Sequence, residues 1–227
     1  MIEIIGFLVQ HNNYAAIYFS GDSDYNVLAG NVFTDNYPLT FSGGSHNLVR
    51  DSNITGSATH AYLSGSGNLN NTFLNISYST ENVDIGSKLI RKWYVDIYAT
   101  YDGTNPLSSV TVSITNDGQP PATTQASGYT ARQEITQYID NGTIENRTLS
   151  LSATKVGYTG DTFGPDNITS NRIFGDGGPI MLSLSALPPG PPGPGSNSNG
   201  SAPGFEFSMF IVLLTCFLVV MLALLSV

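Results

Sequence analysis

The stretch IYFSG at residues 17–21 recurs as LTFSG at 39–43 and as AYLSG at 61–65, a period of 22 residues. Two further columns keep this period, namely Asn31 with Asn53 and Asn75, and Val32 with Ile54 and Ile76. Within each segment an outward residue stands between two apolar ones and a glycine follows, which indicates a strand that ends in a turn. One segment cannot bury its apolar residues alone. We therefore expect the segments to stack one strand spacing apart as a parallel β-solenoid.

This repeat region, residues 1–80, resembles the right-handed β-helix repeats of the family that includes NosD-like surface proteins and carbohydrate-active enzymes. The resemblance implies a short right-handed parallel β-helix of about three coils. Family members bind or cleave polysaccharide, or serve as structural shafts. Two functions therefore stay open: a non-catalytic structural or binding module, and a polysaccharide lyase or hydrolase fragment with its active site in upstream coils. Residues 1–13 lack the basic start of a secretory signal. We therefore expect this chain to be the membrane-proximal end of a longer exported protein.

Residues 86–187 carry longer runs in which apolar and polar residues alternate, beginning at Trp93. Later candidate strands are 110–114, 129–138, 149–156 and 180–184. The stretch WYVDIYATYDGTNPLSSVTVSI at 93–114 resembles the first hairpin of immunoglobulin-like or carboxypeptidase-regulatory-like surface domains. That resemblance implies an antiparallel β-sandwich that serves as a spacer, and we expect Trp93 in its core.

Proline, glycine, serine and asparagine dominate residues 188–204, which favours an extended stalk over a helix or a sheet. Residues 207–227 then run without a single charge. As a helix, this stretch would cross the roughly 30 Å hydrocarbon core of a bilayer. The sequence therefore predicts an all-β ectodomain followed by one C-terminal transmembrane α-helix, the anchor or sorting segment 205–227.

The tripeptide Pro203-Gly204-Phe205, directly before this apolar run, resembles the PGF-type C-terminal sorting signal of archaeal surface proteins. In that family an archaeosortase, a sorting transpeptidase of the membrane, removes the helix and leaves a lipid-linked product. The basic residues that usually follow the helix are missing here, so a eukaryotic lipid-anchor signal remains the alternative. Both interpretations give a single-pass or lipid-anchored protein whose N-terminal part is extracellular.

The formal net charge of −9 repels phosphate backbones, which argues against nucleic acid as a partner. The expected partners are the membrane, the sorting enzyme, and a surface polysaccharide or neighbouring surface proteins. The single cysteine, Cys216, excludes a disulfide within the chain. Sequons for N-linked glycans all precede the apolar run, as expected of an extracellular glycoprotein; they begin at Asn53, Asn70, Asn75, Asn141, Asn146, Asn167 and Asn199.

No nucleophile elbow, P-loop or zinc-protease motif occurs, so the sequence predicts no catalytic or cofactor-binding residue. A constant 22-residue register would stack Asp24, His46 and Asn68 on neighbouring rungs. This column is either a metal or acid/base site or a solvated polar ladder at a turn. Carboxylates at strand faces or in glycine-rich loops are further candidates for Ca²⁺, namely Asp22 with Asp24, and Asp161 with Asp166 and Asp176.

Overall fold

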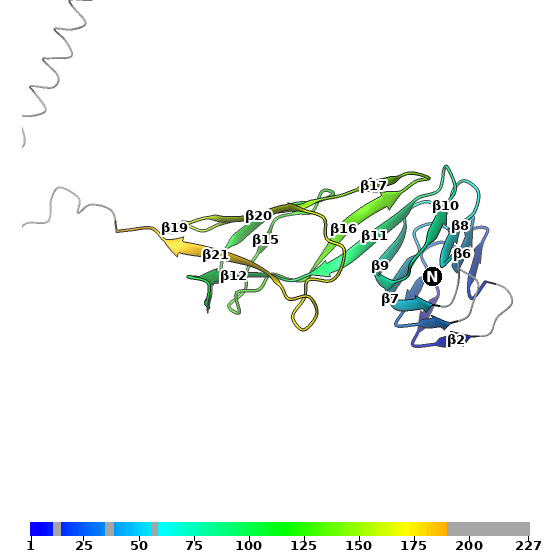
Figure 1. Cartoon of the computed structure of the whole chain (residues 1–227), viewed down its shortest axis with the longest axis horizontal. Coiled ribbons are helices and arrows are strands. Elements are labelled where there is room, and N and C mark those ends of the chain that lie inside the picture. Colours follow the sequence, from blue (N-terminus) through cyan, green and yellow to red (C-terminus); the bar gives the residue numbers. More distant parts are fainter. Residues whose placement is uncertain (11–14, 35–38, 56–58, 190–227) are drawn as a thin grey trace, which may run out of the picture. The chain divides into compact units, whose positions relative to one another are not determined.

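The computed structural model describes residues 1–10, 15–34, 39–55 and 59–189 (Figure 1). These residues form 21 strands and no helix, which confirms the all-β prediction for this part of the chain. Contacts divide the chain into one unit from Met1 to Leu187 and another from Pro188 to Val227. The predicted anchor 205–227 and most of the predicted stalk lie outside the described residues, among which no helix is long and apolar enough to span a bilayer.

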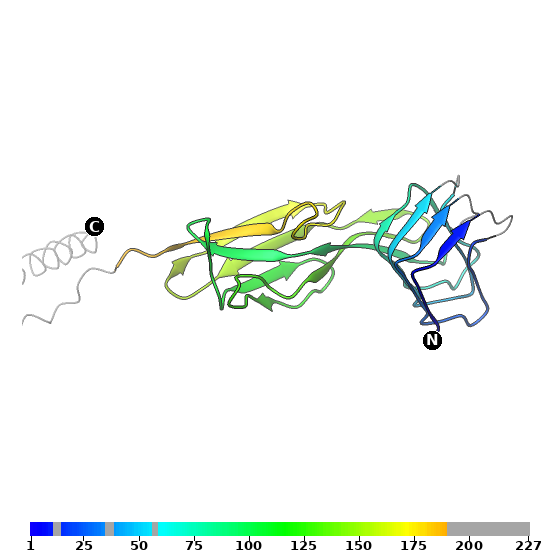
Figure 2. The same cartoon turned by 90° about the horizontal axis from the view of Figure 1, so that it is seen from below.

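The repeat region folds into a right-handed parallel β-solenoid, as expected, but with about four turns in place of the three coils predicted. One side of the solenoid is a parallel sheet of four short strands, which are β3 (Tyr18–Ser20), β6 (Leu39–Ser42), β8 (Ala61–Leu63) and β10 (Glu81–Val83). The other sides belong to a nine-stranded sheet, whose solenoid strands are β1 (Glu3–Ile5), β2 (Leu8–Gln10), β4 (Val27–Ala29), β5 (Val32–Thr34), β7 (Leu48–Thr55) and β9 (Asn71–Ser77). Figure 2 shows these strands lying side by side.

The predicted period of 22 holds for the first three strands of the four-stranded side, whereas the last step, from Leu63 to Val83, has an offset of 20. Phe19 is in register with Phe41, and Phe41 with Leu63, and all three side chains are buried. The rings of Phe19 and Phe41 stack with their centroids 4.5 Å apart. The interior of the solenoid is therefore a continuous apolar ladder along this side.

On the other sides the offset differs, so the predicted columns that start at Asn31 and Val32 are wrong. Val32 pairs with Asn53 at an offset of 21, and Asn53 pairs with Ser77 at an offset of 24. Phe33, and not Val32, is the buried residue opposite Ile54. The reason is that the turns joining the sides differ in length from coil to coil, so one constant period cannot hold all the way round.

In each coil the chain bends between the side that contains β4 and the side that contains β5. One residue with a positive φ forms this bend in every coil. These four residues, called the corner column below, are Gly6 (72°), Gly30 (63°), Asp51 (52°) and Asn75 (53°). Among L-residues, asparagine and aspartate tolerate this left-handed conformation best, and glycine adopts it freely. The first two rungs therefore carry no side chain at the corner, whereas the last two carry an aspartate and an asparagine.

Buried asparagines form a second ladder, which the sequence interpretation missed because its spacings are 21 and 24. The backbone N–H and Nδ2 of Asn26 both donate to Oδ1 of Asn47, at 2.9 and 3.0 Å. Asn47 repeats this pattern with Oδ1 of Asn71, at 3.0 Å for both bonds. Each Oδ1 thereby accepts hydrogen bonds from the backbone N–H and the carboxamide of the asparagine one coil earlier. These polar groups are buried without losing their hydrogen bonds.

Strand β11 (Leu89–Val95) belongs to two ladders (Figure 1). It lies parallel to β9, with Leu89 opposite Asn71, and so forms the last rung of the solenoid. It also lies antiparallel to β16 (Gln133–Asp140), which continues into a hairpin with β17 (Ile144–Asn146). After Asp96 the chain runs on directly as strand 97–101, so no linker separates the solenoid from residues 96–187.

What we call the second β region, residues 96–187, contains two four-stranded sheets besides the hairpin of β16 and β17. The first sheet contains β13 (Asn105–Pro106), β12 (Ile97–Tyr101), β21 (Ile180–Ala186) and β19 (Tyr158–Thr159). The second contains β15 (Ala122–Thr123), β14 (Thr111–Thr115), β18 (Leu149–Thr154) and β20 (Asp161–Asp166). Inward residues of both sheets join Trp93 in one hydrophobic cluster, which confirms the core position predicted for this residue.

Two details of the second β region correct the predictions. Strands β12 and β21 pair in parallel, so the region is not wholly antiparallel. The segment from Asp161 to Asp166 was expected to be a glycine-rich loop, but it is strand β20, paired with β18. Glycines at 157, 160 and 164 lie in and just before this strand, and this local composition suggested a loop.

Candidate functional site

Asp51 and Asn75 place polar groups at the end of the corner column, where the solenoid meets the second β region. They lie on neighbouring rungs, in β7 and β9. Nδ2 of Asn75 donates a hydrogen bond to Oδ1 of Asp51 at 2.8 Å. Glycines at these two positions, as at Gly6 and Gly30, would offer nothing for a partner to bind.

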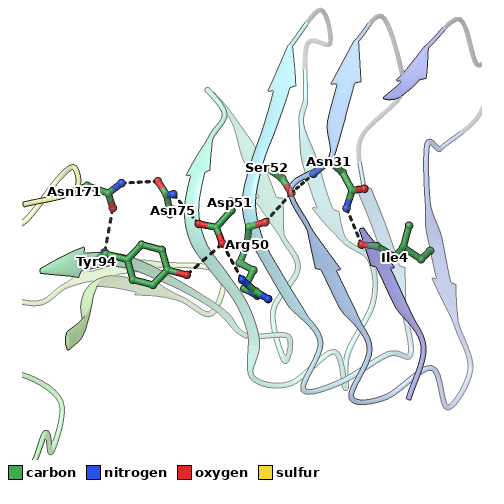
Figure 3. A network of polar contacts seen from close by, with 8 residues as sticks. All are labelled: Ile4, Asn31, Arg50, Asp51, Ser52, Asn75, Tyr94 and Asn171. Atoms are coloured by element: carbon green, nitrogen blue, oxygen red, sulfur yellow. Dashed lines mark hydrogen bonds and ion pairs between the residues drawn. The ribbon is translucent and has the colours of Figure 1, made fainter. Parts of the chain in front are cut away.

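Two residues from outside the solenoid coils complete this polar group, which we call the junction (Figure 3). Nδ2 of Asn171 donates to Oδ1 of Asn75 at 2.8 Å, and Oδ1 of Asn171 accepts from the backbone N–H of Tyr94 at 3.1 Å. The hydroxyl of Tyr94 donates to Oδ2 of Asp51 at 3.3 Å. The four side chains thus form a closed chain of hydrogen bonds between solenoid and second β region.

The guanidinium of Arg50 balances the negative charge of Asp51 in the junction. Nη1 of Arg50 lies 3.0 Å from Oδ2 of Asp51, and this hydrogen bond raises the pKa of Arg50 above its ordinary value. Burial, and then the Asp51 carboxylate, raise the pKa of Tyr94. The Tyr94 hydroxyl therefore stays protonated at neutral pH and acts as a donor to Asp51.

Asn171 begins a loop that comprises residues 171–178. Asp96 contacts this loop further along. Its carboxylate accepts from Nε and Nη2 of Arg132 at 2.9 and 3.1 Å, and from the backbone N–H of Phe174 at 3.3 Å. Its backbone N–H donates to the carbonyl of Arg172 at 2.8 Å. Burial raises the pKa of Asp96, but the hydrogen bonds from Arg132 and Phe174 lower it more, so the net pKa lies below the ordinary value. Asn171 and Asp96 together hold the loop against β11 and β12.

A buried cluster closes the interior of the last solenoid coil. The hydroxyls of Tyr78 and Tyr138 lie 2.8 Å apart, and Tyr138 donates to the carboxylate of Glu81. The guanidinium of Arg91 lies 4.4 Å from the ring centroid of Tyr78 and 5.1 Å from that of Trp93. Burial and the Glu81 carboxylate raise the pKa of Tyr138 to about 12, so this cluster is a polar cap held together by neutral hydroxyls.

The structure does not bring the candidate metal ligands Asp24 and His46 onto one column. The local offset of 21 places Asp24 beside Ser45, whose backbone N–H donates to Oδ1 of Asp24 at 2.6 Å. The ring of His46 instead stacks on Tyr25, with centroids 4.9 Å apart. Asn68, the third member, is buried and accepts from the backbone N–H of Gly43 at 2.6 Å.

The aspartates that are candidates for Ca²⁺ do not come together at one site. Asp22 and Asp24 lie after the end of β3 and so do not share a strand face as predicted, and Asp22 is exposed. Asp161 accepts from the backbone N–H of Ser183 at 2.7 Å, and Asp176 accepts from Nδ2 of Asn171 at 3.0 Å. Asp166 is exposed at the end of β20. Within the described ranges, no three His, Cys, Asp or Glu residues gather as a metal site would require.

The sequons lie in different environments. Asn53 is exposed in β7, Asn141 and Asn146 are exposed on the hairpin of β16 and β17, and Asn75 is half-buried in the junction. Asn70 has a positive φ in the turn before Asn71. Asn167 is half-buried, and its Oδ1 has no hydrogen-bond partner. Asn199 and the anchor motif Pro203, Gly204 and Phe205 lie outside the described residues.

No protein-family model matches the chain, and the searches of curated proteins and of solved structures find no match either. Function is therefore inferred from the geometry of the chain. Sequence reasoning did not single out Asp51, Tyr94 or Asn171. The one available signal was the change from glycine to aspartate and asparagine along the corner column, which is visible only with the correct register.

Proposed function

We propose that the chain is a non-catalytic structural or binding module, anchored at a cell surface, in which a solenoid shaft continues into an immunoglobulin-like spacer. The observation that carries this proposal is the double pairing of β11, with β9 on one edge and β16 on the other. Domains joined by a linker move relative to one another by default. A strand shared by two ladders resists such motion, because bending there breaks backbone hydrogen bonds.

The junction supports the same role. The side chains of Asp51 and Asn75 have no counterpart at Gly6 and Gly30, so the polar contacts occur only on the rungs nearest the second β region. Such a joint suits a module that keeps an outer part at a set distance from its anchor.

The remaining parts of the proposal come from the sequence. Residues 96–187, with one core between two sheets, would be an immunoglobulin-like spacer in an archaeal surface protein with NosD-like repeats. Residues 188–204 would form the stalk, and 205–227 the membrane anchor. Pro203-Gly204-Phe205 would mark it for a sorting transpeptidase, leaving residues before 205 outside the cell.

The first solenoid turn supports neighbouring surface proteins as partners. Its apolar side chains are exposed, at 65% for Ile2, 57% for Ile5 and 59% for Phe7. In the following turns the inward positions are covered by the next coil. A further β-solenoid turn is the partner whose chemistry fits this end, because it offers both apolar side chains and a strand edge. Outward Tyr18 and Tyr62 are the surface on which a polysaccharide would stack.

Membrane fractionation tests the location. The full chain, expressed with a secretion signal, should stay in the membrane pellet after a carbonate wash or carry a lipid on a shortened C-terminus. A matched chain that ends at Leu187 should appear in the medium. Recovery of the full, lipid-free chain in the aqueous fraction would contradict the proposal.

Distance measurement by electron paramagnetic resonance tests the shaft. Spin labels are attached to cysteines that replace the exposed residues Asn82 and Ser113, in a chain that also carries Cys216→Ser. The distance between the two labels then reports on motion about the shared strand β11. We expect one narrow distance distribution. A matched pair at Asn82 and Asn53, both within the solenoid, gives the width of a single rigid body. A clearly broader distribution for the first pair than for the second would refute the rigid joint.

A further inference from the structure

We propose that folding separates two neighbouring sequons: Asn53 is a site of N-linked glycan attachment, and Asn75 is kept unmodified by the junction. The two sequons are Asn-Ile-Thr at 53–55 and Asn-Ile-Ser at 75–77, and they lie on adjacent rungs of the solenoid. The two sequons differ in their third residue, Thr55 against Ser77, so a variant with identical sequons is needed to isolate the effect of the fold. The inference deepens the proposed surface role, because it says where that surface is covered by glycan.

The carboxamide of Asn75 is engaged at both ends. Its Nδ2 donates to Oδ1 of Asp51 at 2.8 Å, and its Oδ1 accepts from Nδ2 of Asn171 at 2.8 Å. The backbones of both asparagines are held, Asn75 in the corner column and Asn53 by its pairing with β5 and β9, so the contrast lies in their carboxamides. A glycosylating enzyme must hold the oxygen of the Asn75 carboxamide and reach its nitrogen, and both atoms already bind other residues.

The carboxamide of Asn53 has no hydrogen-bond partner among the described residues, and its side chain is exposed. The register shift explains the contrast: Asn53 pairs with Ser77, whereas Asn75 shares its column with Asp51. Asn53 therefore stands on the outward face of β7, between the outward residues Val32 and Ser77. Thr55, which the sequon requires, is exposed on the same face.

The chemistry needs a lipid-linked oligosaccharide as the donor. Nδ2 of the asparagine forms a bond to the anomeric carbon of the first sugar, and the bond from that carbon to the lipid pyrophosphate oxygen breaks. The amide gives one proton to a base of the transferase, and the lipid pyrophosphate leaves as the anion. At Asn75 the added sugar would stand beside Asp51 and Asn171, and it would part the solenoid from the loop 171–178.

Glycosylation in vitro tests the inference without relying on export. The folded full chain in detergent is incubated with a purified single-subunit oligosaccharyltransferase and its lipid-linked oligosaccharide, and the glycopeptides are quantified by mass spectrometry. Synthetic peptides of residues 47–58 and 69–80 serve as unfolded acceptors. We expect both peptides to be modified, and the folded chain to be modified at Asn53 and not at Asn75.

The variant Ser77→Thr makes the two sequons identical, and Asn75 should still remain unmodified in the folded chain. Equal modification of Asn53 and Asn75 in the folded chain would overturn the inference. So would an unmodified Asn53 in the folded chain beside a modified 47–58 peptide. Because enzyme and donor are supplied, these outcomes concern the fold alone, whereas the carbonate wash tests attachment to the membrane.

Discussion

Nδ2 of Asn171 lies 2.8 Å from Oδ1 of Asn75, although 96 positions separate the two residues. Asn171 belongs to the loop that precedes β21, and Asn75 to the last corner of the solenoid. The contact therefore closes a ring formed by β9, β11 and the loop 171–178. Its loss would leave β11 as the main connection between the two regions.

Asn171→Ala tests the energetic role of this contact. The substitution leaves Oδ1 of Asn75 and the backbone N–H of Tyr94 without their partner, at a site where Asn171 itself is buried. We expect the free energy of unfolding to fall by about 2 kcal/mol. Denaturant unfolding measures this fall. Asn146→Ala, at an exposed site, is the control and should change little; equal losses in both variants would refute the role of the junction.

Asn47→Ala should cost more, because it interrupts the buried ladder in the middle. Asn26 loses its acceptor for two hydrogen bonds, and Oδ1 of Asn71 loses one of its two donors. We expect a loss of about 3 kcal/mol in unfolding free energy. Asn53→Ala removes the same group from an exposed position and should lie within about 0.5 kcal/mol of the parent chain. A similar melting temperature for the two variants would contradict the importance of the ladder.

Gly30 tests whether the corner column depends on backbone conformation. Its φ is 63°, and a Cβ added there would have no atom within 4 Å, so only conformational strain opposes a substitution. Gly30→Val should lower the unfolding free energy by at least about 1 kcal/mol. Gly30→Asn should be nearly neutral, since asparagine occupies the same corner at Asn75. Thermal unfolding that ranks valine equal to asparagine would count against this account.

Acid should weaken the hold of Asp96 on the loop 171–178. Because the folded pKa of Asp96 is lowered, its contribution is fully present above the ordinary carboxyl pKa of about 3.9 and is lost as the pH falls through the folded value. Arg132→Leu removes the paired guanidinium and should be less stable than the parent chain at pH 7. The gap in unfolding free energy between the two should narrow below about pH 4. A gap that stays constant from pH 7 to pH 2 would refute the pairing.

Some features of the fold were readable from local pattern. The alternation in IYFSG and its recurrence predicted the stacked Phe19, Phe41 and Leu63, because the first three strands of that side are spaced 22 residues apart. Trp93 was likewise placed correctly in a core, since a large apolar ring at an inward strand position has few alternatives. These predictions depended on residues close together in sequence, or on an exact repeat.

The predicted stacking of Asp24 and His46, in contrast, was wrong. Asp24 and His46 were paired by the constant period, and a single missing residue in one turn moved Asp24 to Ser45 and His46 to Tyr25. A shift of one residue in a strand changes the column in which every later side chain lies. The same shift hid the ladder of Asn26, Asn47 and Asn71 behind the incorrect column that begins at Asn31.

By itself the sequence determined that the described chain is β structure with a repeated coil, because alternation and turn residues act over a few neighbours. Only the tertiary structure decided which residues share a column, that β11 pairs with β9 on one edge and with β16 on the other, and that Asn75 meets Asn171. Those outcomes depend on turn lengths and on contacts between distant segments. The physical reason is that hydrogen bonds such as the one between Asn75 and Asn171 form only after backbone pairing has brought their partners within about 3 Å.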